Sequence, residues 1–170
     1  MAAAVSLIQM NVTPVISVHI PFGGDNHRDL GLATEAEQTA SAIGTIAALM
    51  QALESARLSD RVSLISLNVF GRTLGPNNTD GRQHNPNHQV SFAIGKPFRA
   101  GVMGGVGPVG NDYGALSIDS KTGRGGPDGD ITALDSLASF GSTLLSAVGI
   151  GAQTITEQIP TGTVITAALA

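Results

Sequence analysis

Two segments, TPVISVHI at 13–20 and RVSLISLNVF at 61–70, decide the expected fold of this chain. Both are rich in β-branched residues and are typical of buried strands. The residues between them begin with a polar turn at 21–29 and continue with a long run of helix-forming residues. A strand, a helix and a strand in this order predict a βαβ unit, in which the two strands are parallel and the crossover is right-handed.

The helix between these strands is predicted from apolar residues that recur at three- and four-residue steps. Thr34 and Glu37 fit a capping box at its start, and we expect its end near Arg57 or Leu58. The predicted buried face comprises Ala36, Ala40, Ile43, Ala47, Met50 and Leu53.

The whole chain of 170 residues is expected to form a single α/β domain with a mainly parallel sheet. Residues 12–95 would hold the βαβ core and two polar loops, with a third strand near its end. Residues 96–129 are glycine-rich and predict irregular loops, consistent with 22 Gly and 8 Pro in the chain. Residues 130–170 predict a last helix and a tail. The expected apolar face of this helix is Leu134, Leu137, Gly141, Leu144 and Val148.

Composition excludes several classes of function. The net charge of −4 argues against broad binding to nucleic acids or anionic membranes, which needs a basic surface. The chain has no cysteine, so disulfides, zinc–thiolate sites and cysteine nucleophiles are excluded. No uninterrupted apolar run approaches the 18 residues or so of a membrane span.

The four histidines lie at the ends of predicted strands or in the polar loops that follow them: His19, His27, His84 and His88. Ligands of an open parallel sheet bind beyond the carboxyl ends of its strands. The expected pairing would therefore bring Asp25 and His27 to the same rim as His84 and His88. Imidazole and carboxylate groups suit zinc, manganese or iron. The alternative is that these histidines are solvated or capping loop residues.

Two further features also have more than one interpretation. Arg72 could bind an anionic substrate oxygen, or it could be a solvated loop charge. The segment 105–110 matches GxGxxG, but Pro108 interrupts it, so we interpret it as a loop. A nucleotide-binding α/β domain is the third hypothesis that this segment leaves open.

The order of the motifs resembles that of a known family. Gly-Gly-Asp-Asn-His at 23–27 precedes the helix, Leu-Ser-Asp-Arg-Val at 58–62 opens the second strand, and Phe-Gly-Arg-Thr at 70–73 ends it. Asp-Gly-Arg-Gln-His-Asn-Pro-Asn-His follows at 80–88. Together these residues resemble the C-terminal half of the DUF1501 proteins, relatives of the alkaline phosphatase and sulfatase superfamily. The resemblance covers most of residues 12–150 and implies a three-layer α/β sandwich.

The resemblance also implies a site for zinc or manganese in a hydrolase of phosphate or sulfate esters. The implied metal ligands are Asp25, His27, His84 and His88, and Arg72 would hold the anionic group of the substrate. Gln83 and Val69 stand where the family has acidic residues. Both departures reduce the negative charge available for two dications, so they favour one ion, or none, over two.

The family's nucleophile and a further metal ligand lie in an N-terminal half that has no counterpart before Thr13. The chain would then be one lobe, incomplete for catalysis alone, that needs an N-terminal half or a partner chain. The family resemblance, with an export signal upstream, implies a periplasmic or extracellular location. The alternative is a non-catalytic structural or partner-binding domain, which predicts an exposed apolar patch and a homo-oligomer or a partner.

Overall fold

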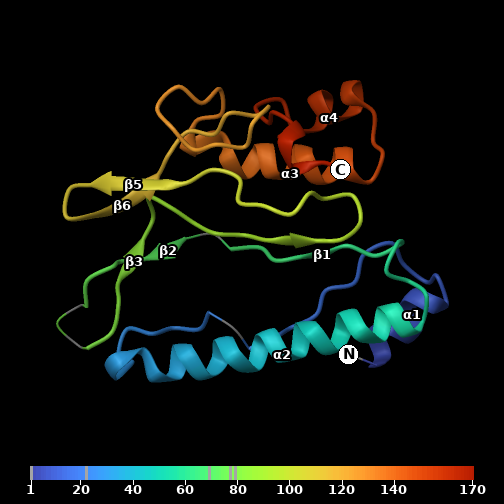
Figure 1. Cartoon of the computed structure of the whole chain (residues 1–170), viewed down its shortest axis with the longest axis horizontal. Coiled ribbons are helices and arrows are strands. Elements are labelled where there is room, and N and C mark those ends of the chain that lie inside the picture. The colour runs from blue at the N-terminus through green and yellow to red at the C-terminus, as the bar shows by residue number, and fades with distance from the viewer. Residues whose placement is uncertain (1, 22, 69, 77, 79) are drawn as a thin grey trace. The chain divides into compact units, whose positions relative to one another are not determined.

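The structure, a computed structural model, describes residues 2–21, 23–68, 70–76, 78 and 80–170. The chain divides into two compact units (Figure 1). The first comprises Met1–Ser63 and Gly75–Gln83, and the second comprises Leu64–Leu74 and His84–Ala170.

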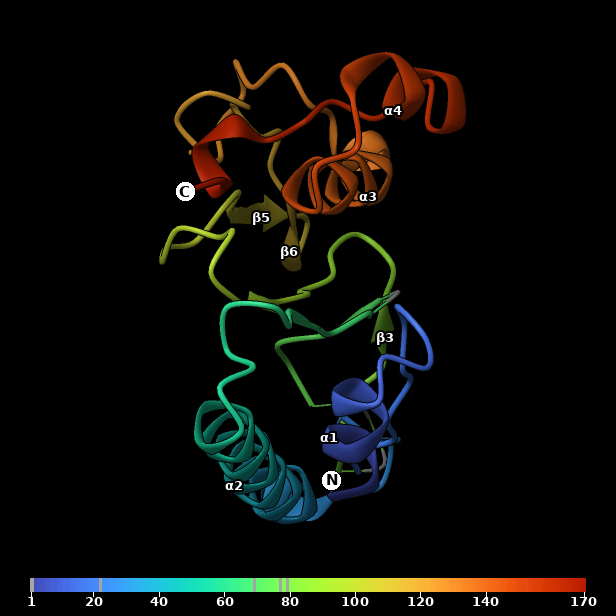
Figure 2. The same cartoon turned by 90° about the vertical axis from the view of Figure 1, so that its right-hand side faces the viewer.

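The first unit is built on two helices and a short 3-10 turn. They are α1 (Ala2–Gln9), η1 (Leu30–Leu32) and α2 (Ala33–Ser55). Figure 2 shows α1 beside α2, and the two helices are in contact. The buried residues of α1 are Ala4 and Val5, and those of α2 are Ala42, Leu49 and Leu53.

The predicted helix is present, but the predicted cap and most of its predicted face are wrong. The helix starts at Ala33. The carboxylate of Asp29 accepts hydrogen bonds from the first amides of the helix, and this replaces the predicted capping box of Thr34 and Glu37. Of the predicted face, only Leu53 is buried and Met50 is half-buried. Alanine occurs on every side of α2, so apolar spacing alone identifies the helix without selecting the side that packs. The remaining predicted positions are exposed: Ala36, Ala40, Ile43 and Ala47.

The second unit contains three small sheets followed by two helices. Each sheet has two antiparallel strands, in the pairs β1–β4, β2–β3 and β5–β6. α4 packs against α3. The strands are β1 (Leu64–Ile65), β2 (Gly71–Arg72), β3 (His84–Asn85), β4 (Ala93–Ile94), β5 (Val106–Val109) and β6 (Asp112–Ala115). The helices are η2 (Ala133–Asp135), α3 (Ser136–Ala147), α4 (Ala152–Gln158) and η3 (Thr166–Ala168).

These sheets contradict the predicted fold class. Among the described residues there is no parallel sheet, so the right-handed βαβ unit and the three-layer α/β sandwich are wrong. Residues 13–20 form no strand, and within 61–70 only Leu64–Ile65 does, paired antiparallel with β4. Strand propensity describes a residue that fits a pleated, half-buried surface, and it does not select the partner strand.

The glycine-rich segment contains a regular hairpin. Residues 106–109 of the GxGxxG-like sequence form β5, which pairs with β6 in a hairpin. The interpretation of this segment as a loop is therefore wrong, although it does not open a helix either. Residues that follow this hairpin in the chain form the hydrophobic core of the second unit, which comprises Ile118, Ile131 and Ile165.

The buried face of α3 is polar, contrary to the predicted apolar face. Its buried residues are Ser139, Ser142 and Thr143, whereas Leu134, Leu137 and Val148 of the predicted face are exposed. The hydroxyl of Ser139 accepts the amide of Thr163 at 3.0 Å, and that of Thr143 accepts the amide of Ile165 at 2.9 Å. Side-chain oxygens of α3 therefore hold the tail by hydrogen bonds, and Ile165 of the tail packs in the core with Ile118. Among the described residues, no helix is both long and apolar enough to cross a bilayer.

Replacement of Thr143 by Val should destabilise the protein. Valine keeps the shape but leaves the amide of Ile165 buried without an acceptor, which costs about 1–3 kcal/mol. Ser142→Ala is the matched control, because the buried Ser142 hydroxyl has no hydrogen-bond partner among the described residues. Denaturant titration should show a lower free energy of unfolding for Thr143→Val and little change for Ser142→Ala. Equal losses would contradict the assigned role of Thr143.

Candidate functional site

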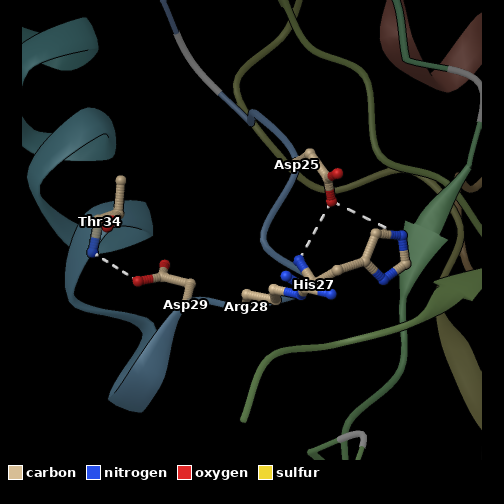
Figure 3. A pocket seen from close by; sticks show the side chains of 5 residues that line it. All are labelled: Asp25, His27, Arg28, Asp29 and Thr34. Atoms are coloured by element: carbon tan, nitrogen blue, oxygen red, sulfur yellow. Dashed lines mark hydrogen bonds and ion pairs between the residues drawn. The ribbon is translucent and has the colours of Figure 1, made fainter. Parts of the chain in front are cut away.

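Asp25 and His27 face each other across a tight turn in the first unit. The backbone amide of His27 donates a hydrogen bond to Oδ1 of Asp25 at 3.1 Å. Nε2 of the same histidine lies 3.6 Å from that oxygen (Figure 3). This side chain-to-backbone contact two residues apart is the usual hydrogen bond of an aspartate-stabilised turn. The turn therefore brings one carboxylate and one imidazole together.

The residue between them anchors the turn. Asn26 is buried, and its side-chain amide donates to the carboxylate of Glu35 on α2. Its backbone carbonyl accepts the amide of Arg82 at 3.1 Å. A Cβ at Gly81 would lie 1.9 Å from the same carbonyl oxygen, so only glycine permits this approach. The turn at 80–82, distant in sequence, thus closes over the backbone of the Asp25–His27 turn.

The carboxylate of Asp29 joins this turn to the start of α2. It accepts the amides of Thr34 at 2.9 Å and Glu35 at 2.8 Å. Burial alone would raise the pKa of Asp29, but these hydrogen bonds and one from the Thr34 hydroxyl together hold it below its ordinary value. Asp29 therefore caps the N-terminus of α2, because it supplies the acceptors for these two amides.

A small pocket opens at this place, with a volume of about 250 Å³ (Figure 3). Clefts for drug-sized ligands start at roughly 300 Å³, so this pocket suits an ion or a small anionic group better. Its lining combines two carboxylates, one imidazole and one guanidinium. The lining residues are Asp25, His27, Arg28, Asp29 and Thr34.

Arg72 and His84 lie opposite each other in the second unit, in the β2–β3 pair. The His84 ring lies 4.3 Å from that of Phe70, measured between ring centroids. The guanidinium carbon of Arg72 lies 5.8 Å from the centre of the same ring. This distance is within the range of a cation–π contact, so the ring of Phe70 supports both side chains.

His88 packs on the backbone of β2. A Cβ at Gly71 would lie 2.0 Å from Cε1 of His88, so the imidazole occupies the space of a missing side chain. Its Nδ1 atom is buried and has no hydrogen-bond partner among the described residues. The ring is therefore positioned by packing rather than by a hydrogen bond at Nδ1.

Asp112 belongs to the surroundings of His88, and sequence reasoning missed it. The hydrogen bond from the amide of Leu74 is the main cause that holds the pKa of Asp112 below its ordinary value. Burial opposes this effect, while hydrogen bonds from Tyr113 and Asn85 and the charge of His88 support it. In the sequence Asp112 stands in a turn-like run after the glycine motif, which gives no sign of this contact.

The predicted site residues thus fall into two sets. Asp25 and His27 belong to the first unit, and Arg72, His84 and His88 belong to the second. That the two sets share one site stays a prediction. Among the residues that the structure describes, no group of three or more histidine or carboxylate side chains could hold a metal ion. Val69 lies outside the described residues.

Comparisons with protein-family models, with curated proteins and with solved structures each found no match to this chain.

Asp29→Asn should reduce the acid sensitivity of the first unit. A lowered folded-state pKa of Asp29 stabilises the fold above the ordinary value of 3.8, and this contribution is lost as pH falls through the folded-state pKa. The variant should therefore unfold more easily at neutral pH and lose less stability on acidification. The measurement is denaturant unfolding followed by helical circular dichroism across this pH range. Glu37→Gln, at an exposed position of α2, controls for the loss of one negative charge. A variant with the pH dependence of the wild type would contradict this role.

Proposed function

We propose that this chain is the metal-ligating lobe of a hydrolase of phosphate or sulfate esters, in which Asp25 and His27 bind one divalent ion. The supporting observation is the 3.6 Å separation of Asp25 Oδ1 and His27 Nε2. Oxygen and nitrogen ligands lie about 2.0–2.2 Å from zinc, so two of them on a tetrahedral ion are roughly 3.3–3.6 Å apart. The two donor atoms therefore fit adjacent positions on one ion.

Two ligands form half of a tetrahedral set. Catalytic zinc usually has three protein ligands and one open position, so at least one ligand must come from elsewhere. The DUF1501 resemblance assigns a further ligand and the nucleophile to the N-terminal half of the family's proteins. His84 and His88 are the other ligands that the resemblance implies. On this proposal the chain alone does not hydrolyse esters.

The bound ion would polarise the ester and activate the nucleophile. The residues of this chain would contribute charge and position. Asp25 supplies the negative charge that attracts a dication, and the buried Asn26 fixes the turn that carries both ligands. Arg28 lines the same pocket and would attract the anionic oxygens of the ester. The resemblance also gives Arg72 the role of binding the anionic group of the substrate through its planar guanidinium.

Titration with zinc and with manganese at neutral pH tests this proposal. The wild-type chain should bind one ion weakly but saturably, and Asp25→Asn or His27→Gln should weaken binding at least about tenfold, or roughly 1.4 kcal/mol. His19→Gln is the matched control, since His19 is an exposed histidine of the same unit. Losses in His84→Gln and His88→Gln would support their proposed role as ligands.

Two results would contradict the proposed metal site. A wild-type chain that binds neither ion, and whose melting temperature a chelator does not change, would exclude Asp25 and His27 as ligands. Unchanged affinity in both single variants would exclude them as well.

A second candidate function is that of a non-catalytic, partner-binding domain. Several large apolar side chains are exposed, among them Leu30, Leu67 and Leu134. Exposed apolar surface of this kind is what a partner chain would cover. A metal titration without binding, together with a stable complex with a partner, would favour this candidate.

A further inference from the structure

The backbone of their turn does much to position the side chains of Asp25 and His27. The side chain of Asp25 is 73% exposed and that of His27 is 30% exposed, so packing does little to fix the carboxylate. The hydrogen bond from the His27 amide to Oδ1 of Asp25 belongs to the turn itself (Figure 3). The contacts that hold this turn therefore decide where the two donor atoms lie.

The central residue of the turn has two separate anchors, both within the first unit. The side chain of the buried Asn26 donates to Glu35 through Nδ2. Its Oδ1 atom is buried and has no hydrogen-bond partner in the part of the chain that the structure describes. The second anchor is the backbone carbonyl of Asn26, which accepts the amide of Arg82 at 3.1 Å. Half of the side-chain amide is thus unpaired, so the backbone anchor carries more of the task.

Gly81 makes this backbone anchor possible. A Cβ at this position would lie 1.9 Å from the carbonyl oxygen of Asn26, 2.3 Å from the carbonyl carbon of His27 and 2.5 Å from its oxygen. The preceding residue, Asp80, has a φ of 66°, which is uncommon for residues other than glycine. Such conformations persist where the surroundings fix them. The turn at 80–82 therefore lies directly against the backbone that carries the proposed ligands.

We propose that Gly81 is a positioning residue for the metal site, through which the turn at 80–82 fixes the Asp25–His27 donor pair and thereby sets its affinity for an ion. This inference rests on the proposed function. Binding groups must be held within about 0.5 Å of their productive geometry by the residues behind them. Residues that support ligands without touching the ion typically change its affinity 10–100-fold. Gly81 contacts the backbone of His27 itself, so it acts on a ligand directly.

Gly81→Ala tests the proposal by separating the two turns. Real Cβ atoms do not approach another atom within 3.0 Å, and the atoms in the way are backbone, so one turn must move. A contact that grows from 1.9 Å to at least 3.0 Å exceeds the tolerance of about 0.5 Å. Calorimetric titration should therefore show zinc affinity at least about tenfold weaker than in the wild type.

Gly75→Ala is the matched control. Gly75 belongs to the same segment of the first unit, Gly75–Gln83, and a Cβ there would meet no atom within 4 Å. The same substitution at this position should leave the zinc affinity unchanged. Equal helical circular dichroism in the three proteins verifies that each is folded.

Hydrogen exchange of the His27 amide, followed by NMR in the metal-free protein, gives a readout that needs no ion. Gly81→Ala should speed this exchange at least about tenfold, because the turn loses its support, and Gly75→Ala should not. The amides of Leu49 and Leu53, buried on α2, should keep their rates, whereas a merely structural role would speed all of them.

A second variant removes the same contact without a new Cβ at position 81. Arg82→Pro deletes the amide that donates to Asn26, and it should speed the exchange of the His27 amide as Gly81→Ala does. Arg82→Ala is its control, because it keeps the amide.

The two readouts separate this inference from the proposed function. A wild type that binds no zinc would contradict the proposed function, and the exchange of the His27 amide would still decide whether the turn at 80–82 fixes the pair. Unchanged exchange of this amide in Gly81→Ala, equal acceleration throughout α2, or faster exchange with unchanged zinc affinity would each overturn the inference.

Discussion

Side-chain oxygens pair many backbone amides in this protein, and the rest of the structure depends on this. Buried amides must have acceptors, and strands of two to four residues supply few of them. Asp29 pairs the first amides of α2, and Asp112 pairs those of Leu74 and Tyr113. Ser139 and Thr143 hold the tail in the same way. The fold thus relies on polar side chains where a larger sheet would use strand ladders.

This pairing has an electrostatic consequence. Hydrogen bonds from the hydroxyl and amide of Ser120 are the leading causes that hold the pKa of Asp130 below its ordinary value. The amide of Thr122 is the leading cause of the same shift for the pKa of Asp119. Each such carboxylate stabilises the fold only while it is ionised, so these contributions are lost together as pH falls. Acid therefore weakens the hydrogen bonds by which these carboxylates connect one element to another.

The sequence predicted which elements form better than it predicted their partners. The length of α2 follows from its helix-forming residues, and its observed end at Ser55 is close to the expected one. Its buried side was not predictable, because small alanine side chains allow several faces to pack. Residues 61–70 contain a strand, but its partner is β4, which follows it, and not residues 13–20. Strand pairing depends on turns and long-range packing that periodicity does not contain.

The candidate site shows the same division. Asp25 and His27 lie close together because they are two residues apart in one turn, which the local sequence determines. The contact of Gly81 with Asn26 follows from close packing of two backbones, and the sequence shows it only as a glycine in a polar loop. Asp112 is recognisable only from its contacts, because nothing in its neighbouring sequence distinguishes it from a solvated turn residue. Local chemistry was therefore predictable, and tertiary contacts were not.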